Sequence, residues 1–185
     1  MVKGEVHWNM TGQHSVANAL ATIAAAEHVG VAIETACAAL SNFGGVKRRM
    51  ELLGTIKGVE VYDDFAHHPT AIETTLDGAR KRLGERKLWA IIEPRSNTMR
   101  MGSHKDGLAH SARLADQVIW YQPEGMDWDL QPVIDASANK AMIARSLDEI
   151  IQTVSGQAGE GDAVVIMSNG GFGGLHQKLL RALKA

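Results

Sequence analysis

Residues 59–70, VEVYDDFAHHPT, are the stretch around which the rest of this chain is organised. The stretch begins as a strand, because Val59, Val61 and Phe65 favour extended backbone, and Pro69 then suits the first turn of a helix. Its polar side chains fall where the strand gives way to the helix: Asp63, Asp64, His67 and His68. In an open α/β sheet, ligands bind at the carboxyl ends of the strands, beside helix N-termini. We therefore predict a ligand site in this loop.

Strand and helix patterns alternate on the carboxyl side of this stretch. The apolar runs 88–92 and 163–167 are typical of strands buried on both faces. Ser146 with Glu149 has the form of a capping box at the start of a helix. The alternation predicts an α/β fold, with a mostly parallel open sheet and helices on both faces. The expected strands are 50–57, 59–64, 88–92, 117–121, 141–144 and 163–167, and the expected helices begin near residues 69, 105, 146 and 176.

Residues 1–45 have a different pattern. Two alanine-rich helices are expected there, at 12–28 and 32–41, and glycines follow each of them. These helices have no sheet of their own to pack on. We therefore predict that residues 1–45 are the helical tail of a larger domain cut off upstream, and that residues 46–185 form the α/β domain.

Composition excludes several classes of protein. A formal net charge of −2 over 185 residues gives no basic face for nucleic acid. No apolar run reaches about 18 residues, so the sequence gives no support for membrane contact. The single Cys37, among alanines, excludes an internal disulfide and suits a reducing compartment, and we read it as a core residue. The expected location is the cytoplasm.

The polar groups of the first loop, 63–68, allow more than one role. Paired carboxylates and imidazoles are able to bind a divalent cation, a ribose or a phosphate. Alternatively, Asp63 ends the strand, His68 caps the helix and the other two side chains face water. Spacing alone does not separate these roles.

The second loop, EPRSNTMRMG at 93–102, follows the buried strand 88–92. Guanidinium groups bind carboxylates through paired hydrogen bonds, so its two arginines predict an anionic small-molecule substrate. A solvated loop with surface arginines is the alternative. The candidate substrate-binding residues here are Arg95, Ser96, Asn97 and Arg100.

The third loop, SNGGFGG at 168–174, opens the last helix. Glycines let the backbone approach a ligand, and helix N-termini favour anions, although a plain turn fits the pattern as well. Phe172 is unusual for a plain turn, because an aromatic ring there must cover something. Ser168, Asn169 and Phe172 are candidate substrate-binding residues.

Several motifs in order resemble those of the ATP-dependent Mur ligases, which build the peptide stem of the bacterial cell wall. GQHSVANALATIAAA at 12–26 resembles the family's G-x-H-N-x-x-N-A-x-A-A helix. GVKRRMEL at 45–52 resembles its linker into the carboxyl-terminal domain, and DDFAHHPT at 63–70 resembles its DD(Y/F)(G/A)HHP loop. Within the family, the second and third loops look most like those of members that join UDP-N-acetylmuramate to the tripeptide L-Ala-γ-D-Glu-meso-diaminopimelate.

The resemblance implies a reaction with two steps, used in peptidoglycan recycling. ATP phosphorylates the lactyl carboxylate of UDP-N-acetylmuramate, and the amine of the tripeptide then attacks the acyl phosphate to form an amide. Positioning and charge neutralisation by Mg²⁺ and by cationic side chains supply most of the acceleration. ATP and Mg²⁺ are thus the implied cofactors, with Mg²⁺ held mainly by the central domain.

The resemblance also implies roles for single residues. His14 and Asn18 contact adenine, Arg48 or Arg49 reaches the nucleotide, and Asp64 binds the ribose hydroxyls. The implied catalytic residues are His67, which faces the phosphates or the amine, and Asp63, which supports the loop. The implied substrate-binding residues are His68, Arg95, Ser96, Asn97, Arg100, Ser168, Asn169 and Phe172.

The chain also departs from the family pattern. It has no G-x-x-x-x-G-K-[ST] loop for the phosphates and no domain for the UDP-sugar, and Ser15 stands where the family usually has Asn. We therefore expect a fragment that contacts the missing central and amino-terminal domains and that is inactive alone.

Three alternatives remain at this stage. A UDP-N-acetylmuramate–L-alanine ligase would have a similar first loop, but its second loop typically resembles QPHRYTR rather than EPRSNTMR. A binding module without chemistry of its own would describe the isolated chain. A metal-dependent hydrolase would use the two aspartates and two histidines of residues 63–68 as ligands, although the other histidines show no HxH or HExxH spacing.

Overall fold

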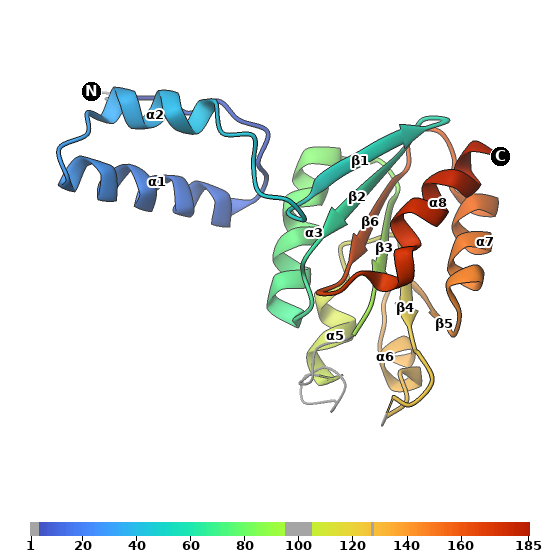
Figure 1. Ribbon diagram of the computed structural model, residues 1–185. Helices are drawn as coiled ribbons and strands as arrows, with labels where there is room; N and C mark the ends of the chain where they lie inside the picture. Colours follow the sequence, from blue (N-terminus) through green and yellow to red (C-terminus); the bar gives the residue numbers. More distant parts are fainter. Residues whose placement is uncertain (1–3, 95–104, 127) are drawn as a thin grey trace. The chain divides into compact units, whose positions relative to one another are not determined.

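The computed structural model describes residues 4–94, 105–126 and 128–185. The chain forms two compact units, Met1–Lys47 and Arg48–Ala185, drawn in Figure 1. Each unit is described by itself. Among the described residues, no helix is both long and apolar enough to cross a membrane.

The first unit is a pair of helices, α1 (Gln13–His28) and α2 (Ile33–Ser41), as the alanine-rich pattern predicted. The contact between them is made by small side chains, and Ala19, Ala36 and Cys37 are buried. Cys37 is therefore a core residue, as expected. Larger apolar side chains remain open to solvent, with Leu20 64% exposed and Val29 76% exposed. The assignment of this unit to a preceding domain stays a prediction.

The second unit is built on a six-stranded sheet in the order β1-β2-β6-β3-β4-β5. β1 pairs antiparallel with β2, and all other neighbours are parallel. The hairpin between β1 and β2 turns at Lys57 and Gly58, both with positive φ, which matches the strand twist. The predicted fold class is confirmed. The strands are β1 (Glu51–Ile56), β2 (Val59–Asp64), β3 (Leu88–Ile92), β4 (Gln117–Tyr121), β5 (Lys140–Ala144) and β6 (Ala163–Met167).

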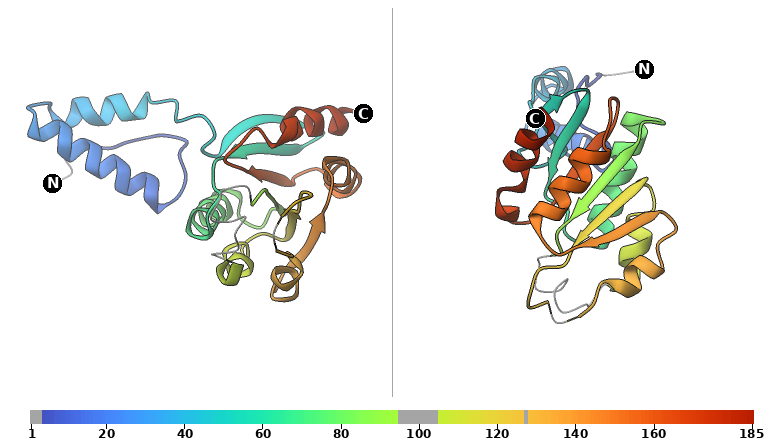
Figure 2. Two further views of the ribbon diagram at one scale, coloured as in Figure 1. Left: turned by 60° about the horizontal axis from the view of Figure 1, so that its bottom comes forward. Right: turned by 90° about the vertical axis from the view of Figure 1, so that its right-hand side faces the viewer.

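Helices cover both faces of this sheet, as Figures 1 and 2 show. Successive strand residues point to opposite faces, so Leu88, Ala90 and Ile92 pack in one core while Trp89 and Ile91 pack in the other. The first core is closed by α3 (Pro69–Leu83), α5 (Lys105–Ser111) and α6 (Gln131–Asp135). The second core is closed by α7 (Leu147–Gln157), η1 (Phe172–Gly174) and α8 (Leu175–Lys184).

The sequence signals for helix ends agree with the structure except in two details. The Ser146 hydroxyl caps α7 by accepting a hydrogen bond from Glu149 N–H at 3.2 Å, as predicted. The Glu149 carboxylate, however, accepts from the N–H of Arg145, one residue before the cap. The helix expected to begin near residue 105 is short and ends at Ser111, where the hydroxyl donates to the Leu108 carbonyl and turns follow.

Candidate functional site

The carboxyl ends of β2, β6, β3 and β4 lie along one edge of the sheet. Strand register places Met167 of β6 opposite both Asp64 of β2 and Ile92 of β3, and Ile92 in turn opposite Trp120 of β4. The loops that follow β2 and β6 therefore leave the sheet side by side, with the end of β3 next to them. We call this the carboxyl edge, and the opposite one the amino edge.

Asp63, at the end of β2, lies between two nitrogen groups. Arg48 Nε donates to its carboxylate at 3.2 Å, and the His176 ring, on α8, donates Nε2–H to it at 3.1 Å. The side chains of Asp63 and His176 are only 12% and 13% exposed. A carboxylate this buried needs hydrogen-bond donors from the protein, and Arg48 and His176 supply them.

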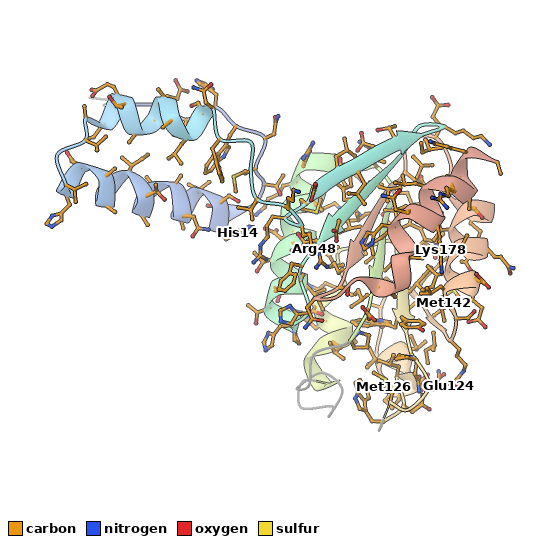
Figure 3. All side chains as sticks on the ribbon, in the orientation of Figure 1. His14, Arg48, Glu124, Met126, Met142 and Lys178 are labelled. Carbon is orange, nitrogen blue, oxygen red and sulfur yellow. The ribbon has the colours of Figure 1, made fainter. Side chains whose placement is uncertain are left out.

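Arg48, which is labelled in Figure 3, connects Asp63 to the loop after β6 through its hydrogen bonds. Its Nη2 donates to the carbonyl oxygens of Ser168 and of Gly170, the second at 2.9 Å. Its backbone is held as well, because its N–H donates to Glu51 and its carbonyl accepts from the N–H of Phe65. The linker and two loops of the carboxyl edge therefore meet at this one residue.

Asp64 is buried in the first loop, with 2% of its surface exposed. Its carboxylate accepts hydrogen bonds from Met50 N–H at 2.9 Å, Ala66 N–H at 2.8 Å and the Thr75 hydroxyl at 3.0 Å. A carboxylate has about four acceptor positions, so three are occupied within the fold. Asp64 therefore shapes the loop, and its contact to a ribose stays a prediction.

His67 and Arg49 both lie against the Phe65 ring. The His67 ring donates Nδ1–H to the Phe65 carbonyl at 2.8 Å and meets the Phe65 ring edge-on at 5.2 Å. This fixes the tautomer and leaves Nε2 to meet a ligand. The guanidinium of Arg49, which is exposed, lies 5.8 Å from the Phe65 ring centre. His68 is the N-cap residue of α3, without a side-chain cap.

The loop after β6 is fixed at its first residue. The buried Ser168 hydroxyl donates to the Glu93 carboxylate at the end of β3 and accepts from the N–H of Gly170 at 2.9 Å. Asn169 Oδ1 is buried and has no hydrogen-bond partner among the described residues. Phe172 covers the second core, where it is 1% exposed and its ring lies 5.3 Å from that of Tyr121. Its substrate contact stays a prediction.

Tyr121 ends β4 at the same edge. Its pKa is raised by burial and by the negative charges of Glu93 and Glu124. This end of the edge therefore carries negative charge, whereas the end beside β2 carries both signs, with Arg48 and Arg49 next to Asp63 and Asp64. The exposed Arg49 and the acidic groups near Tyr121 offer opposite charges to a ligand that carries both an ammonium and an anionic group.

Other predicted site residues belong to the first unit or fall outside the described residues. His14 and Asn18 are exposed on α1, four residues apart on one helix face, and the neighbouring Ser15 is buried with its hydroxyl donating to the Thr11 carbonyl at 2.7 Å. The adenine contact stays a prediction. The remaining candidates lie outside the described residues: Arg95, Ser96, Asn97 and Arg100.

Sequence reasoning missed two side chains and one loop of the carboxyl edge. Glu93 was inside the quoted loop but was not chosen, although it directly follows a buried strand. The loop that begins at Gln122, after β4, leaves the same edge because β4 is parallel to β3. Nothing in the sequence marked His176 as a site residue, because its partner Asp63 is 113 residues away along the chain.

Across residues 4–94, 105–126 and 128–185, no group of three or more histidine, cysteine or acidic side chains is arranged to hold a metal ion. The four polar residues of the first loop separate instead into hydrogen-bonded roles. Asp63 pairs with nitrogen groups, and Asp64 accepts from backbone and hydroxyl donors. This arrangement gives the hydrolase alternative no support.

Comparison with known proteins identifies the family of the chain. The family described as "Mur ligase, glutamate ligase domain" matches residues 48–170, which include the loop 63–68 and the first three residues of the loop 168–174. The chain belongs to the Mur ligase family. Two curated relatives carry the name UDP-N-acetylmuramate–L-alanyl-γ-D-glutamyl-meso-2,6-diaminoheptandioate ligase. That of Haemophilus influenzae is 46% identical and that of Escherichia coli K12 is 48% identical, each over 97% of this chain.

A solved Mur ligase structure agrees with these relatives. The crystal structure of a murein peptide ligase from Psychrobacter arcticus matches 97% of this chain with a TM-score of 0.76 and 57% identity. The chain covers 38% of that structure and 40% of the length of each curated relative. It therefore corresponds to less than half of these Mur ligases.

Proposed function

We propose that this chain is the carboxyl-terminal part of an ATP-dependent ligase that joins UDP-N-acetylmuramate to L-Ala-γ-D-Glu-meso-diaminopimelate in the cytoplasm, for peptidoglycan recycling. The observation that carries the proposal is the carboxyl edge itself. It brings a fixed glycine loop, a histidine with one free nitrogen and an exposed arginine to the ends of parallel strands. The names of the two curated relatives supply the substrate class.

In this proposal, the chain's own residues bind and orient the peptide. His67 presents Nε2 to the attacking amine or to the phosphate beside it, while Asp63 keeps the loop in place through Arg48. The peptide's carboxylates face Arg95 and Arg100, and its remaining polar groups face the loop at 168–170. The further substrate contacts are His68, Ser96, Asn97 and Phe172.

The nucleotide meets this chain at cationic and polar groups. Asn18 and His14 offer an amide and an imidazole to adenine from one exposed helix face, and Asp64 is the proposed ribose contact. Arg49 suits the phosphates better than Arg48, because its guanidinium is exposed and Arg48 is engaged by Asp63 and two carbonyls. ATP, when bound, supplies the phosphoryl group that activates the lactyl carboxylate of the sugar substrate.

Mg²⁺ does not fit the described part of this chain, since no suitable cluster of ligands is present there. We propose that the cation is held by the rest of the ligase together with the ATP phosphates. The rest of the ligase would also bind UDP-N-acetylmuramate. The 185-residue chain alone should therefore form no amide from ATP, UDP-N-acetylmuramate and tripeptide, and product detected by mass spectrometry would contradict this.

Calorimetry on the chain separates the tripeptide ligase from the L-alanine ligase. Titration with L-Ala-γ-D-Glu-meso-diaminopimelate should release or absorb heat with a saturable curve, and titration with L-alanine should not. The tripeptide has several more charged groups that only its own site can pair. Saturable binding of L-alanine, without binding of the tripeptide, would assign the chain to the other ligase.

A further inference from the structure

Two backbone carbonyls of the loop after β6 converge on a single nitrogen. The carbonyl oxygens of Ser168 and Gly170 both accept from Arg48 Nη2. Carbonyl dipoles that point toward one another repel unless a positive group lies between them. The conformation of residues 168–170 thus depends on the guanidinium.

The same guanidinium is anchored from the other side. Arg48 Nε donates to Asp63, which is also held by His176 of α8. The backbone of Arg48 has φ of 60°, an unfavourable value for a residue with a side chain, and it is kept there by hydrogen bonds to Glu51 and Phe65. Movement of Arg48 toward a ligand would remove one donor from the buried Asp63 carboxylate and the guanidinium donor from two carbonyls.

We propose that Arg48 is a positioning residue, which holds residues 168–170 in the conformation that meets the peptide substrate. Its partner from the sheet side is Ser168, whose hydroxyl fixes both Glu93 and the N–H of Gly170. Residues 168–170 are therefore held by Arg48 of the linker and by Glu93 at the end of β3. The link to the peptide rests on the proposed function, but the fixation of the loop does not.

The test compares three variants of the chain by ¹H–¹⁵N NMR, each titrated with the tripeptide. R48A should move the amide resonances of residues 168–170 and lower the affinity for tripeptide about tenfold or more. R82A is the matched control, because Arg82 is an exposed arginine over the Tyr62 ring at 5.6 Å, outside the carboxyl edge. R82A should leave both the loop amides and the affinity unchanged.

R48K decides the outcome if R48A does not fold. It keeps a positive charge opposite Asp63, but a single ammonium lacks the fork that spans a carboxylate and two carbonyls. The amides of residues 168–170 should then shift while those of the strands stay in place, and the affinity should fall. Unshifted loop amides in R48K, or shifted ones with wild-type affinity, would overturn the proposal. If the unmodified chain binds no tripeptide, the proposed function fails, and the loop amides alone decide the role of Arg48.

Discussion

The amino edge and the carboxyl edge of the sheet both place carboxylates beside arginines. They differ in how many of their polar groups have partners within the fold. At the amino edge, Arg86 donates to Glu60 at 3.0 Å, and Arg80 donates to Asp116 at 2.7 Å. At the carboxyl edge, among the described residues, Arg49 has no carboxylate partner and Asn169 Oδ1 has no donor. We call a network closed when its polar groups are paired within the fold and open when some of them are not. Closed networks stabilise a fold, whereas open networks leave polar groups available to a ligand.

Asp64 tests this contrast most severely, because it lies at the carboxyl edge but, like Asp63, has its carboxylate hydrogen-bonded within the fold. D64A should lower the free energy of unfolding by about 3 kcal/mol, since three buried donors lose their acceptor. Urea unfolding followed by circular dichroism measures the loss. S155A, at an exposed position of α7, serves as the surface control. A loss below about 1 kcal/mol would show that Asp64 is not a structural residue and is free for a ribose.

The amino edge should also control stability at high pH. Burial and the hydrogen bond to Glu60 raise the pKa of Tyr62 to about 12, from 10. A raised tyrosine pKa favours the neutral form in the folded state, so this stability is complete below pH 10 and is lost between about pH 10 and 12. The loss amounts to about 2 to 3 kcal/mol.

Absorbance at 295 nm checks the Tyr62 prediction. The chain has two tyrosines, so Y121F leaves Tyr62 as the only signal. Its titration should be centred near pH 12 in the folded chain, and a midpoint near 10 would contradict the closed network at Glu60.

Acid should weaken the same edge by a smaller amount. Burial acts to raise the pKa of Glu60, but hydrogen bonds from Tyr62 and Arg86 and the positive charge of Arg86 outweigh it and lower the pKa. A lowered carboxylate pKa gives stability that is present above about pH 4.5 and is lost as the pH falls through the folded value. The pair is partly exposed, so E60Q should remove no more than about 1 kcal/mol of this acid-dependent stability.

Chemical unfolding of wild type and E60Q at pH 7 and pH 3 measures the difference. The difference in free energy between the two pH values should be smaller in E60Q. Equal differences in the two proteins would assign the acid sensitivity to other carboxylates, of which Asp116 is the first candidate because its pKa is also lowered.

The smallest effect on stability is expected for Arg49, at the carboxyl edge. R49A should change the free energy of unfolding by no more than about 0.5 kcal/mol, because the side chain is exposed and held only against Phe65. It should nevertheless weaken ADP binding to the chain about tenfold, the equivalent of about 1.4 kcal/mol. Calorimetry with ADP tests this, with R82A as the control. Unchanged ADP affinity in R49A would remove Arg49 from the nucleotide site.

The sequence predicted the sheet better than it predicted the carboxyl edge. The strands 88–92 and 163–167 were found with their final bounds, because continuous apolar runs report burial on both faces locally. The parallel arrangement then correctly brought the loops after β2 and β6 together. These inferences need only neighbouring residues and a rule of topology.

The contacts within the edge could not be predicted in the same way. Arg48 meets Gly170 across 122 residues of sequence, and His176 meets Asp63 across 113. Phe172 was expected to cover something, and it does, but only the fold shows that it covers the core beneath α8. Pattern analysis gives no orientation of side chains, so it grouped Arg48 with Arg49 although one is engaged and the other exposed.

An NMR titration of the ¹⁵N-labelled chain with L-Ala-γ-D-Glu-meso-diaminopimelate tests the contrast between the two edges most directly. We expect saturable shifts in the amides of residues 63–68 and 168–170, with those of Glu60, Asp116 and Asp162 at the amino edge unchanged. Shifts confined to the amino edge, or no shifts at millimolar tripeptide, would contradict the assignment of the carboxyl edge as the peptide site.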